Sequence, residues 1–166
     1  MRMTVQNLKS AFAGESQAHM KYLIFADKAE GEGYSNLARL FRANAFAEQI
    51  HATNHLRELG EIKGSAENAQ AAIEGETFEV EEMYPAYIAV AQAQGEKRAE
   101  RTFQWAIEAE KVHAQLYGRA KEAALGKRDV ELGALYVCEV CGYTSEGEPP
   151  ERCPVCSAKR EKFRRF

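Results

Sequence analysis

Two short segments of this chain share a pattern in which a glutamate precedes a histidine by three residues. A-E-Q-I-H-A contains Glu48 and His51, and A-E-K-V-H-A contains Glu110 and His113. Positions i and i+3 share one face of a helix, so each pair presents a carboxylate and an imidazole in the same direction. Together these groups can bind a divalent metal ion. A single pair of this kind is more often part of a solvated helix face.

Each segment also has an upstream glutamate, which makes the pattern a repeat. Glu15 lies 33 residues before Glu48, and Glu76 lies 34 residues before Glu110. In an antiparallel helical hairpin the two glutamates of each copy reach about the same height, at ~1.5 Å per residue. Two such hairpins face to face gather four carboxylates, which are costly to bury without cations. The repeat therefore predicts the two-metal carboxylate site known from di-iron and di-manganese helix bundles.

The repeat is broken at one position. Glu79 follows Glu76 by three residues, whereas its counterpart in the first copy is Ala18. A diferric centre carries more positive charge than a diferrous centre and favours hard oxygen ligands. We expect Glu79 to bind iron in the oxidised state and neutral His51 to replace it in the reduced state.

Two tyrosines lie close to these glutamates in the sequence. Tyr22 follows Glu15 by seven residues and so shares its helix face, and Tyr84 lies near the level of Glu79. Either the rings belong to the helix core, or their hydroxyl groups donate hydrogen bonds to ligand carboxylates.

The last thirty residues contain all the cysteines of the chain, and they form two C-x-x-C pairs: Cys138, Cys141, Cys153 and Cys156. This spacing predicts a metal site rather than disulfides in a reducing compartment. Four thiolates in a tetrahedron suit iron or zinc. A zinc ribbon remains an alternative, but the nearby aromatic residues favour a redox-active iron: Tyr136, Tyr143, Phe163 and Phe166.

The elements that must position these groups follow from composition and periodicity. Apolar residues recur at helical spacing before residue 126, and glycine-containing breaks divide this part into helices at about 4–30, 35–60, 67–94 and 97–125. Pro85 should kink the third helix. The connection between the second and third helices is longer than the other two, which predicts a ferritin-like four-helix bundle with one long crossover. We predict a mainly α protein with a bundle domain at 1–130 and a small four-cysteine domain at 131–166, joined by a linker at 126–134.

Charge and hydropathy exclude some partners. The formal net charge of −3 and pI of about 5.9 do not favour nucleic acid. No apolar run is long enough to span a bilayer, and the first residues do not resemble a secretion signal. We expect a soluble cytoplasmic protein without a membrane partner.

These motifs, in this order, resemble the rubrerythrin family along essentially the whole chain. The resemblance rests on A-G-E-S, the two A-E-x-x-H-A segments, G-E-T-F-E-V-E-E-M-Y-P and C-x-x-C-G-Y…C-P-x-C. It implies a ferritin-like di-iron domain followed by a rubredoxin-like domain. By position, it also implies that Glu48 and Glu110 bridge the irons, that His51 alternates with Glu79, and that Tyr22 and Tyr84 lie beside the centre. The implied iron ligands are Glu15, Glu48, Glu76, Glu79, Glu110 and His113, with Cys138, Cys141, Cys153 and Cys156 at the separate rubredoxin-type iron.

The resemblance further implies an enzyme, a peroxidase that reduces hydrogen peroxide to water in oxidative-stress defence. Electrons come from reduced pyridine nucleotide through a separate reductase or rubredoxin, and pass through the FeS₄ centre. A homodimer is implied, in some members with helices exchanged between subunits. Two other functions stay open: a ferroxidase that handles iron as ferritins do, and a non-enzymatic bundle with a structural zinc ribbon.

Overall fold

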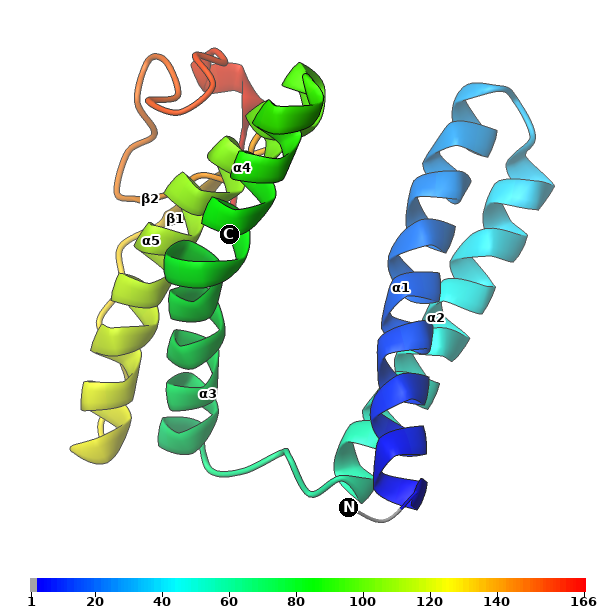
Figure 1. Ribbon diagram of the computed structural model, residues 1–166, viewed down its shortest axis with the longest axis horizontal. Coiled ribbons are helices and arrows are strands. Elements are labelled where there is room, and N and C mark those ends of the chain that lie inside the picture. The colour runs from blue at the N-terminus through cyan, green and yellow to red at the C-terminus, as the bar shows by residue number, and fades with distance from the viewer. Residues whose placement is uncertain (1–2) are drawn as a thin grey trace. The chain divides into compact units, whose positions relative to one another are not determined.

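The computed structural model, which describes residues 3–166, contains the four helical segments predicted from the glycine-containing breaks (Figure 1). The helical bounds are α1 Met3–Gly31, α2 Ser35–Glu58, α3 Ser65–Phe78, α4 Tyr84–Gln94 and α5 Lys97–Leu125. Gly33 and Gly95 have φ angles of +86° and +72° in the turns after α1 and α4. Glycine adopts this left-handed conformation without the steric cost of a Cβ atom, which explains why the helices end there.

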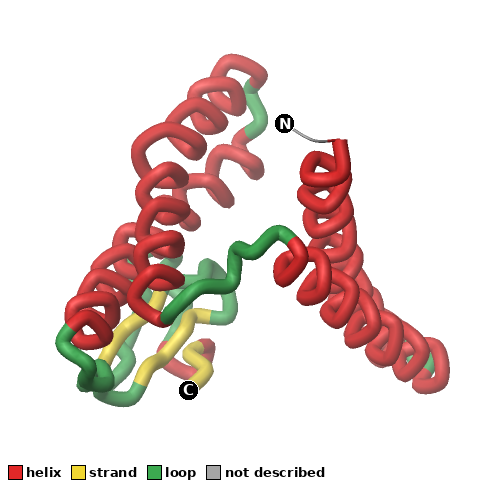
Figure 2. The backbone as a smooth tube through the Cα atoms, turned by 90° about the horizontal axis from the view of Figure 1, so that it is seen from below, coloured by secondary structure: helices red, strands yellow, loops and turns green. Residues whose placement is uncertain are grey.

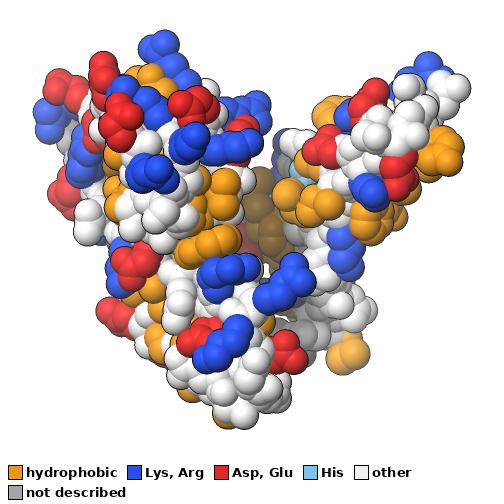
Figure 3. Space-filling view, turned by 90° about the horizontal axis from the view of Figure 1, so that it is seen from above, with side chains coloured by type: hydrophobic (Ala, Val, Ile, Leu, Met, Phe, Trp, Pro, Cys, Tyr) orange, Lys and Arg blue, Asp and Glu red, His pale blue; other side chains and the backbone are white. Residues whose placement is uncertain are grey.

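Helices α1 and α2 form an antiparallel hairpin that packs on alanines. Ala26 and Ala29 of α1 and Ala38 and Ala45 of α2 are each at most 4% exposed. Small side chains let the two helix backbones approach closely, so their dispersion contacts are dense. Larger apolar side chains, including Phe46, stay exposed on the hairpin surface, where hydrophobic side chains are visible in Figure 3.

A second hairpin pairs α3 and α4 with α5, and it repeats the aromatic packing of the first. Phe41 packs against Tyr22 with ring centroids 6.0 Å apart and 38° between the ring planes. Phe103 packs against Tyr84 at 6.0 Å and 36°. The two hairpins therefore share local structure as well as sequence.

The predicted third helix is interrupted near Pro85. A π-helix, η1 (Glu79–Met83), separates α3 from α4, and the Tyr84 N–H donates to the Glu79 carbonyl five residues earlier. Pro85 occupies the first turn of α4, where its missing N–H costs least. The sequence predicted an irregularity here but not its π-helical form.

The four-cysteine segment forms a small antiparallel sheet against α5. The sheet has the order β2-β1-β3, from β1 (Leu135–Cys138), β2 (Thr144–Glu146) and β3 (Phe163–Arg165), with a 3₁₀ turn at Arg160–Lys162. Figure 2 shows these strands beside the helices of the second hairpin. Arg119 of α5 forms a salt bridge with Glu146 of β2, which attaches the sheet to the helix.

The chain divides into two compact units, one ending at Lys63 and the other extending from Gly64 to Phe166. The first unit is the α1–α2 hairpin, and the second contains the other hairpin and the four-cysteine sheet. The connection between α2 and α3 is the longest between the predicted helices, as expected, and consists of the six residues 59–64. None of the helices within residues 3–166 has the length and apolar character needed to cross a membrane.

Candidate metal centres

The first unit brings together three of the predicted ligands, Glu15, Glu48 and His51, which we call the first half-site. Each offers one ligand atom, and these atoms all lie within 4.8 Å of one another. The Nδ1 atom of His51 is 2.9 Å from a Glu48 carboxylate oxygen and 4.0 Å from one of Glu15. The histidine side chain is 54% exposed and the Glu48 side chain only 17%. His51 therefore has room to move relative to the carboxylates.

The second unit brings together Glu76, Glu110 and His113, which we call the second half-site. Their ligand atoms also lie within 4.8 Å of one another. The Nδ1 atom of His113 is 2.6 Å from a Glu110 carboxylate oxygen, and the side chains are 27% and 16% exposed. As in the first half-site, Nδ1 is the imidazole atom that faces the glutamate. The i, i+3 spacing predicted both pairings.

The carboxylates of the second half-site are crowded without a cation. Burial, followed by repulsion from Glu110, raises the pKa of Glu76 to about 7 from its ordinary 4.5. Burial and the charge of Glu110 also raise the pKa of Glu79. These shifts arise because the negative groups are partly desolvated and close together, and a bound divalent ion removes both penalties. The donor set of carboxylates and imidazole thus fits a hard or borderline metal such as iron.

Glu79 lies near the second half-site but is not one of the three groups whose ligand atoms meet there. It is the first residue of the π-helix, and its charge contributes to the raised pKa of Glu76. A signal for the π-helix was present in the sequence: Tyr22 follows Glu15 by seven residues, whereas Tyr84 follows Glu76 by eight. The one extra residue of the second copy falls where the π-helix forms.

The two tyrosines lie in the helix cores, each ring against a phenylalanine. Burial, and then the charges of Glu79, Glu110 and Glu76, raise the pKa of Tyr84. Its hydroxyl group therefore stays protonated near neutral pH and can donate a hydrogen bond. In the first hairpin, His19 Nδ1 lies 2.8 Å from the Ala45 carbonyl oxygen, a contact between α1 and α2 that the sequence did not predict.

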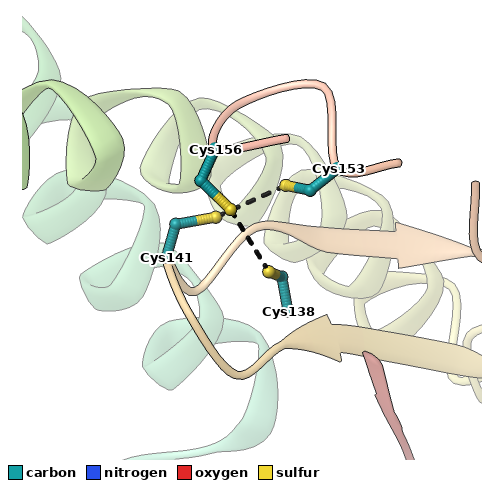
Figure 4. A group of neighbouring side chains, drawn as sticks. All are labelled: Cys138, Cys141, Cys153 and Cys156. Carbon is teal, nitrogen blue, oxygen red and sulfur yellow. Dashed lines mark hydrogen bonds between the residues drawn. The ribbon is translucent and has the colours of Figure 1, made fainter. Parts of the chain in front are cut away.

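The four cysteines point toward one another from two knuckles (Figure 4). The sulfur atoms of Cys138 and Cys156 are 3.6 Å apart, and those of Cys141 and Cys153 are 3.5 Å apart. All four are free thiols, since a disulfide bond is about 2.0 Å long. Sulfurs at ~2.3 Å from a central metal lie roughly 3.8 Å from one another in a tetrahedron, close to the observed spacing. The geometry fits one tetrahedral iron or zinc ion.

A partly buried hydrogen bond connects the four-cysteine sheet to the second half-site. Nε2 of His113 lies 2.8 Å from Oγ1 of Thr144, the first residue of β2. Nearby, Glu146 accepts hydrogen bonds from Arg119 and from the Gly133 N–H, at 2.8 Å for the latter. These contacts, Arg119 first, lower the pKa of Glu146 to about 2. Sequence reasoning missed both Thr144 and Arg119, because their partners lie 31 and 27 residues away.

Comparisons with known proteins agree with this arrangement. The family model for rubrerythrin matches residues 6–121, and the model for the rubrerythrin rubredoxin-like domain matches residues 136–164. Rubrerythrin-2 of Clostridium acetobutylicum is 45% identical, over 99% of this chain and 97% of its own. Nigerythrin of Nitratidesulfovibrio vulgaris is 36% identical, over 96% and 85%.

A solved structure of nigerythrin in a fully reduced, all-ferrous state is also similar. It aligns with a TM-score of 0.57 and 35% identity, over 98% of this chain and 86% of that one. The match therefore includes both the helical segments and the four-cysteine sheet. With matching family models over both parts and a relative 45% identical along nearly its whole length, the chain belongs to the rubrerythrin family.

Proposed function

We propose that this protein is a peroxidase that reduces hydrogen peroxide to water at a di-iron centre. The observation that carries the proposal is the pair of matching half-sites, each with two glutamates and a histidine, in a chain that also holds a four-cysteine site. A pair of ferrous ions bound by these residues would supply the two electrons that, with two protons, convert one H₂O₂ into two water molecules. Family membership supports an oxidoreductase.

The protein's own residues have separate tasks in this proposal. Glu15, Glu48, Glu76 and Glu110 would hold the irons, and His113 would be a permanent ligand. His51 would be the ligand that exchanges with Glu79 according to the oxidation state of the centre. Tyr84 is neutral at physiological pH, its pKa being raised further by burial, and can donate a hydrogen bond to a ligand carboxylate or to peroxide. Tyr22 has the equivalent place in the first hairpin.

Electrons enter through the rubredoxin-like domain. We assign iron rather than zinc to Cys138, Cys141, Cys153 and Cys156, because a redox-inactive zinc cannot carry electrons. The helical part at 1–130 supplies the residues for the reduction, and residues 131–166 deliver the electrons. Rubredoxin or an NAD(P)H-dependent reductase is the proposed donor.

The length of the α2–α3 connection bears on how the half-sites combine. In a ferritin-like bundle the crossover runs from the end of the second helix back along the bundle, so that the third helix starts at the opposite end. Ten residues separate Glu48 from the end of α2 at Glu58, and eleven separate Ser65 from Glu76. For Glu48 and Glu76 to lie at the same height, the connection must span both helix lengths, which is roughly 30 Å at 1.5 Å per residue. Seven Cα–Cα steps from Glu58 to Ser65 reach about 25 Å at most.

The connection is thus too short for one chain to complete a ferritin-like bundle by itself. We therefore propose a homodimer in which the α1–α2 hairpin of each copy packs on α3–α5 of the other. The exposed apolar side chains on both units provide the surface for this exchange, among them Phe46 and Ile50 of the first unit and Phe78 and Val90 of the second.

Mixing two inactive variants tests the exchange. Glu48→Ala damages the first half-site and Glu110→Ala the second. In an exchanged heterodimer one centre receives both damaged halves and the other receives two intact halves, so activity returns. If each chain completes its own centre, every centre carries one substitution and the mixed sample stays inactive. Co-expression with two affinity tags isolates the heterodimer.

Spectroscopy and rapid kinetics test the peroxidase reaction. The dithionite-reduced, iron-loaded protein should regain its rubredoxin-type absorption on adding stoichiometric H₂O₂, and faster than with O₂. Glu110→Ala should abolish the reoxidation by peroxide while the four-cysteine absorption remains. Faster oxidation by O₂ with accumulation of ferric iron indicates a ferroxidase instead, and purification with zinc at the cysteines indicates a structural ribbon. Either result overturns the proposal.

A further inference from the structure

Thr144 occupies an unusual position in the four-cysteine sheet. Among residues 3–166 it is the one polar residue that is buried as a whole, at 6% exposure. It begins β2 opposite Val137 of β1, next to Cys138. A buried hydroxyl group is stabilised only when it is hydrogen-bonded, and Thr144 has partners on both sides.

The Thr144 hydroxyl group lies between a carbonyl acceptor and the imidazole ring of His113. The Thr144 hydroxyl is placed to donate to the Gly142 carbonyl oxygen, at 3.4 Å. Its oxygen lies 2.8 Å from Nε2 of His113 and accepts a hydrogen bond from that atom whenever Nε2 carries the proton. In the metal-free chain Nδ1 is hydrogen-bonded to Glu110 at 2.6 Å. A metal bound at Nδ1 would take the place of the proton in that bond, and a neutral imidazole then carries its proton on Nε2. Thr144 is thus placed to hold the tautomer that His113 needs when its Nδ1 atom binds a metal together with the glutamates.

We propose that Thr144 is a positioning residue for His113, fixing both the tautomer and the ring orientation of this ligand, and that it joins the four-cysteine site to the second half-site of the same chain. Histidine ligands commonly depend on such a partner at the second ring nitrogen. Here the partner comes from the rubredoxin-like domain, so the docking of that domain controls the ligand.

Two other features hold Thr144 in place. Arg119 and the Gly133 N–H both bind Glu146, at the other end of the three-residue strand β2. A cavity of about 330 Å³ borders His113 and Thr144 and is walled mainly by apolar side chains such as Leu116 and Leu135. Few competing polar groups are therefore available to Nε2.

The same contact provides a short electron route, a part of the inference that rests on the proposed function. Thr144 follows Cys141 by only three residues. A path through the backbone of residues 141–144 and one hydrogen bond reaches His113 without leaving the second unit. One electron moves per transfer, and two transfers restore the centre after each peroxide.

Three variants of the full chain test the positioning role. Thr144→Val has nearly the same shape but no hydroxyl group, and Thr144→Ser restores the hydroxyl. Ser145→Ala is the matched control, because the neighbouring Ser145 hydroxyl is buried without a hydrogen-bond partner in the described part of the chain. Competition with a chelator measures Zn²⁺ affinity at the Glu/His site. We expect Thr144→Val to lower it about 10- to 100-fold, while the other two variants stay close to the original.

Nuclear magnetic resonance of the zinc-loaded protein, labelled with ¹⁵N at its four histidines, provides a direct readout. The Nε2–H proton of His113 should be visible and slow to exchange with solvent in the original chain and in Thr144→Ser, and should exchange fast in Thr144→Val. Unchanged exchange and affinity in Thr144→Val overturn the inference. If these effects appear but the iron-loaded protein does not reduce peroxide, the proposed function fails and the positioning role stands.

Discussion

Replacing Glu76 by glutamine should stabilise the metal-free protein and weaken its metal binding. Glutamine keeps the size of the side chain but removes the charge that is partly buried beside Glu110. In the metal-free chain that charge is unfavourable, which is why the pKa of Glu76 is raised to about 7. With metal bound, the same carboxylate group is a ligand and its charge is favourable. The two states should therefore respond to the substitution with opposite signs.

The magnitude follows from the pKa shift. Raising a carboxyl pKa from 4.5 to about 7 means that the folded state binds this proton more tightly than the unfolded state. The free energy of unfolding of the metal-free chain then falls as the pH rises from about 4.5 to about 7, and is level above. A shift of this size corresponds to at most ~3.4 kcal/mol, at 1.36 kcal/mol per pH unit. Because Glu76 is partly exposed, solvent screening reduces the expected effect to ~1–2 kcal/mol.

Urea denaturation followed by circular dichroism measures this effect in protein whose Glu/His sites have been stripped of metal. At pH 7.5, Glu76→Gln should unfold at higher urea than the original chain, and at pH 4.5 the two should coincide. Added Zn²⁺ should then stabilise the original chain more than the variant. Glu81→Gln, at an exposed glutamate of the adjoining π-helix, controls for a general loss of negative charge. Equal effects of both substitutions, or a pH dependence that Glu76→Gln leaves intact, would refute the reasoning.

Three further predictions concern parts that support the sites. Arg119→Met removes the partner of Glu146, so protease cleavage in the linker at 126–134 should accelerate, and an unchanged cleavage rate would contradict the docking role. Cys156→Ser should abolish the rubredoxin-type absorption and NAD(P)H-linked turnover, while the helical signal in far-ultraviolet circular dichroism stays unchanged. Turnover that survives this substitution would exclude the electron route through the four-cysteine site. Ala45→Leu, at a fully buried contact of the first hairpin, should lower the unfolding free energy by ~1–3 kcal/mol through overpacking, whereas Ala43→Leu at an exposed position of the same helix should not.

The helices were predictable because their ends are encoded locally. Gly33 and Gly95 mark turns that need a left-handed backbone, and the apolar periodicity between such turns specifies the helices. The E-x-x-H pairs were predictable for the same reason, since i, i+3 neighbours meet in any helix. The contact of Thr144 with His113 was not predictable, because no local rule relates a strand residue to a helix residue 31 positions away.

The one-residue difference between the two copies of the repeat now has a structural explanation. Tyr22 and Tyr84 pack on their phenylalanine partners with nearly the same distance and angle, although Tyr84 is one residue further from its upstream glutamate. A regular α-helix would rotate Tyr84 by about 100° for that extra residue. The π-helix at Glu79–Met83 absorbs the residue and keeps the ring in place.

The added residue therefore changes only the turn that carries Glu79. That turn has i, i+5 hydrogen bonds instead of the regular ladder, and it supplies the single carboxylate for which the first hairpin has Ala18. A ligand that binds in one oxidation state and leaves in the other needs a backbone less constrained than that of its permanent neighbours. Glu76, inside α3, and Glu110, inside α5, have regular helices around them. The position of the π-helix thus supports the proposal that Glu79, and not Glu76 or Glu110, is the ligand that exchanges with His51.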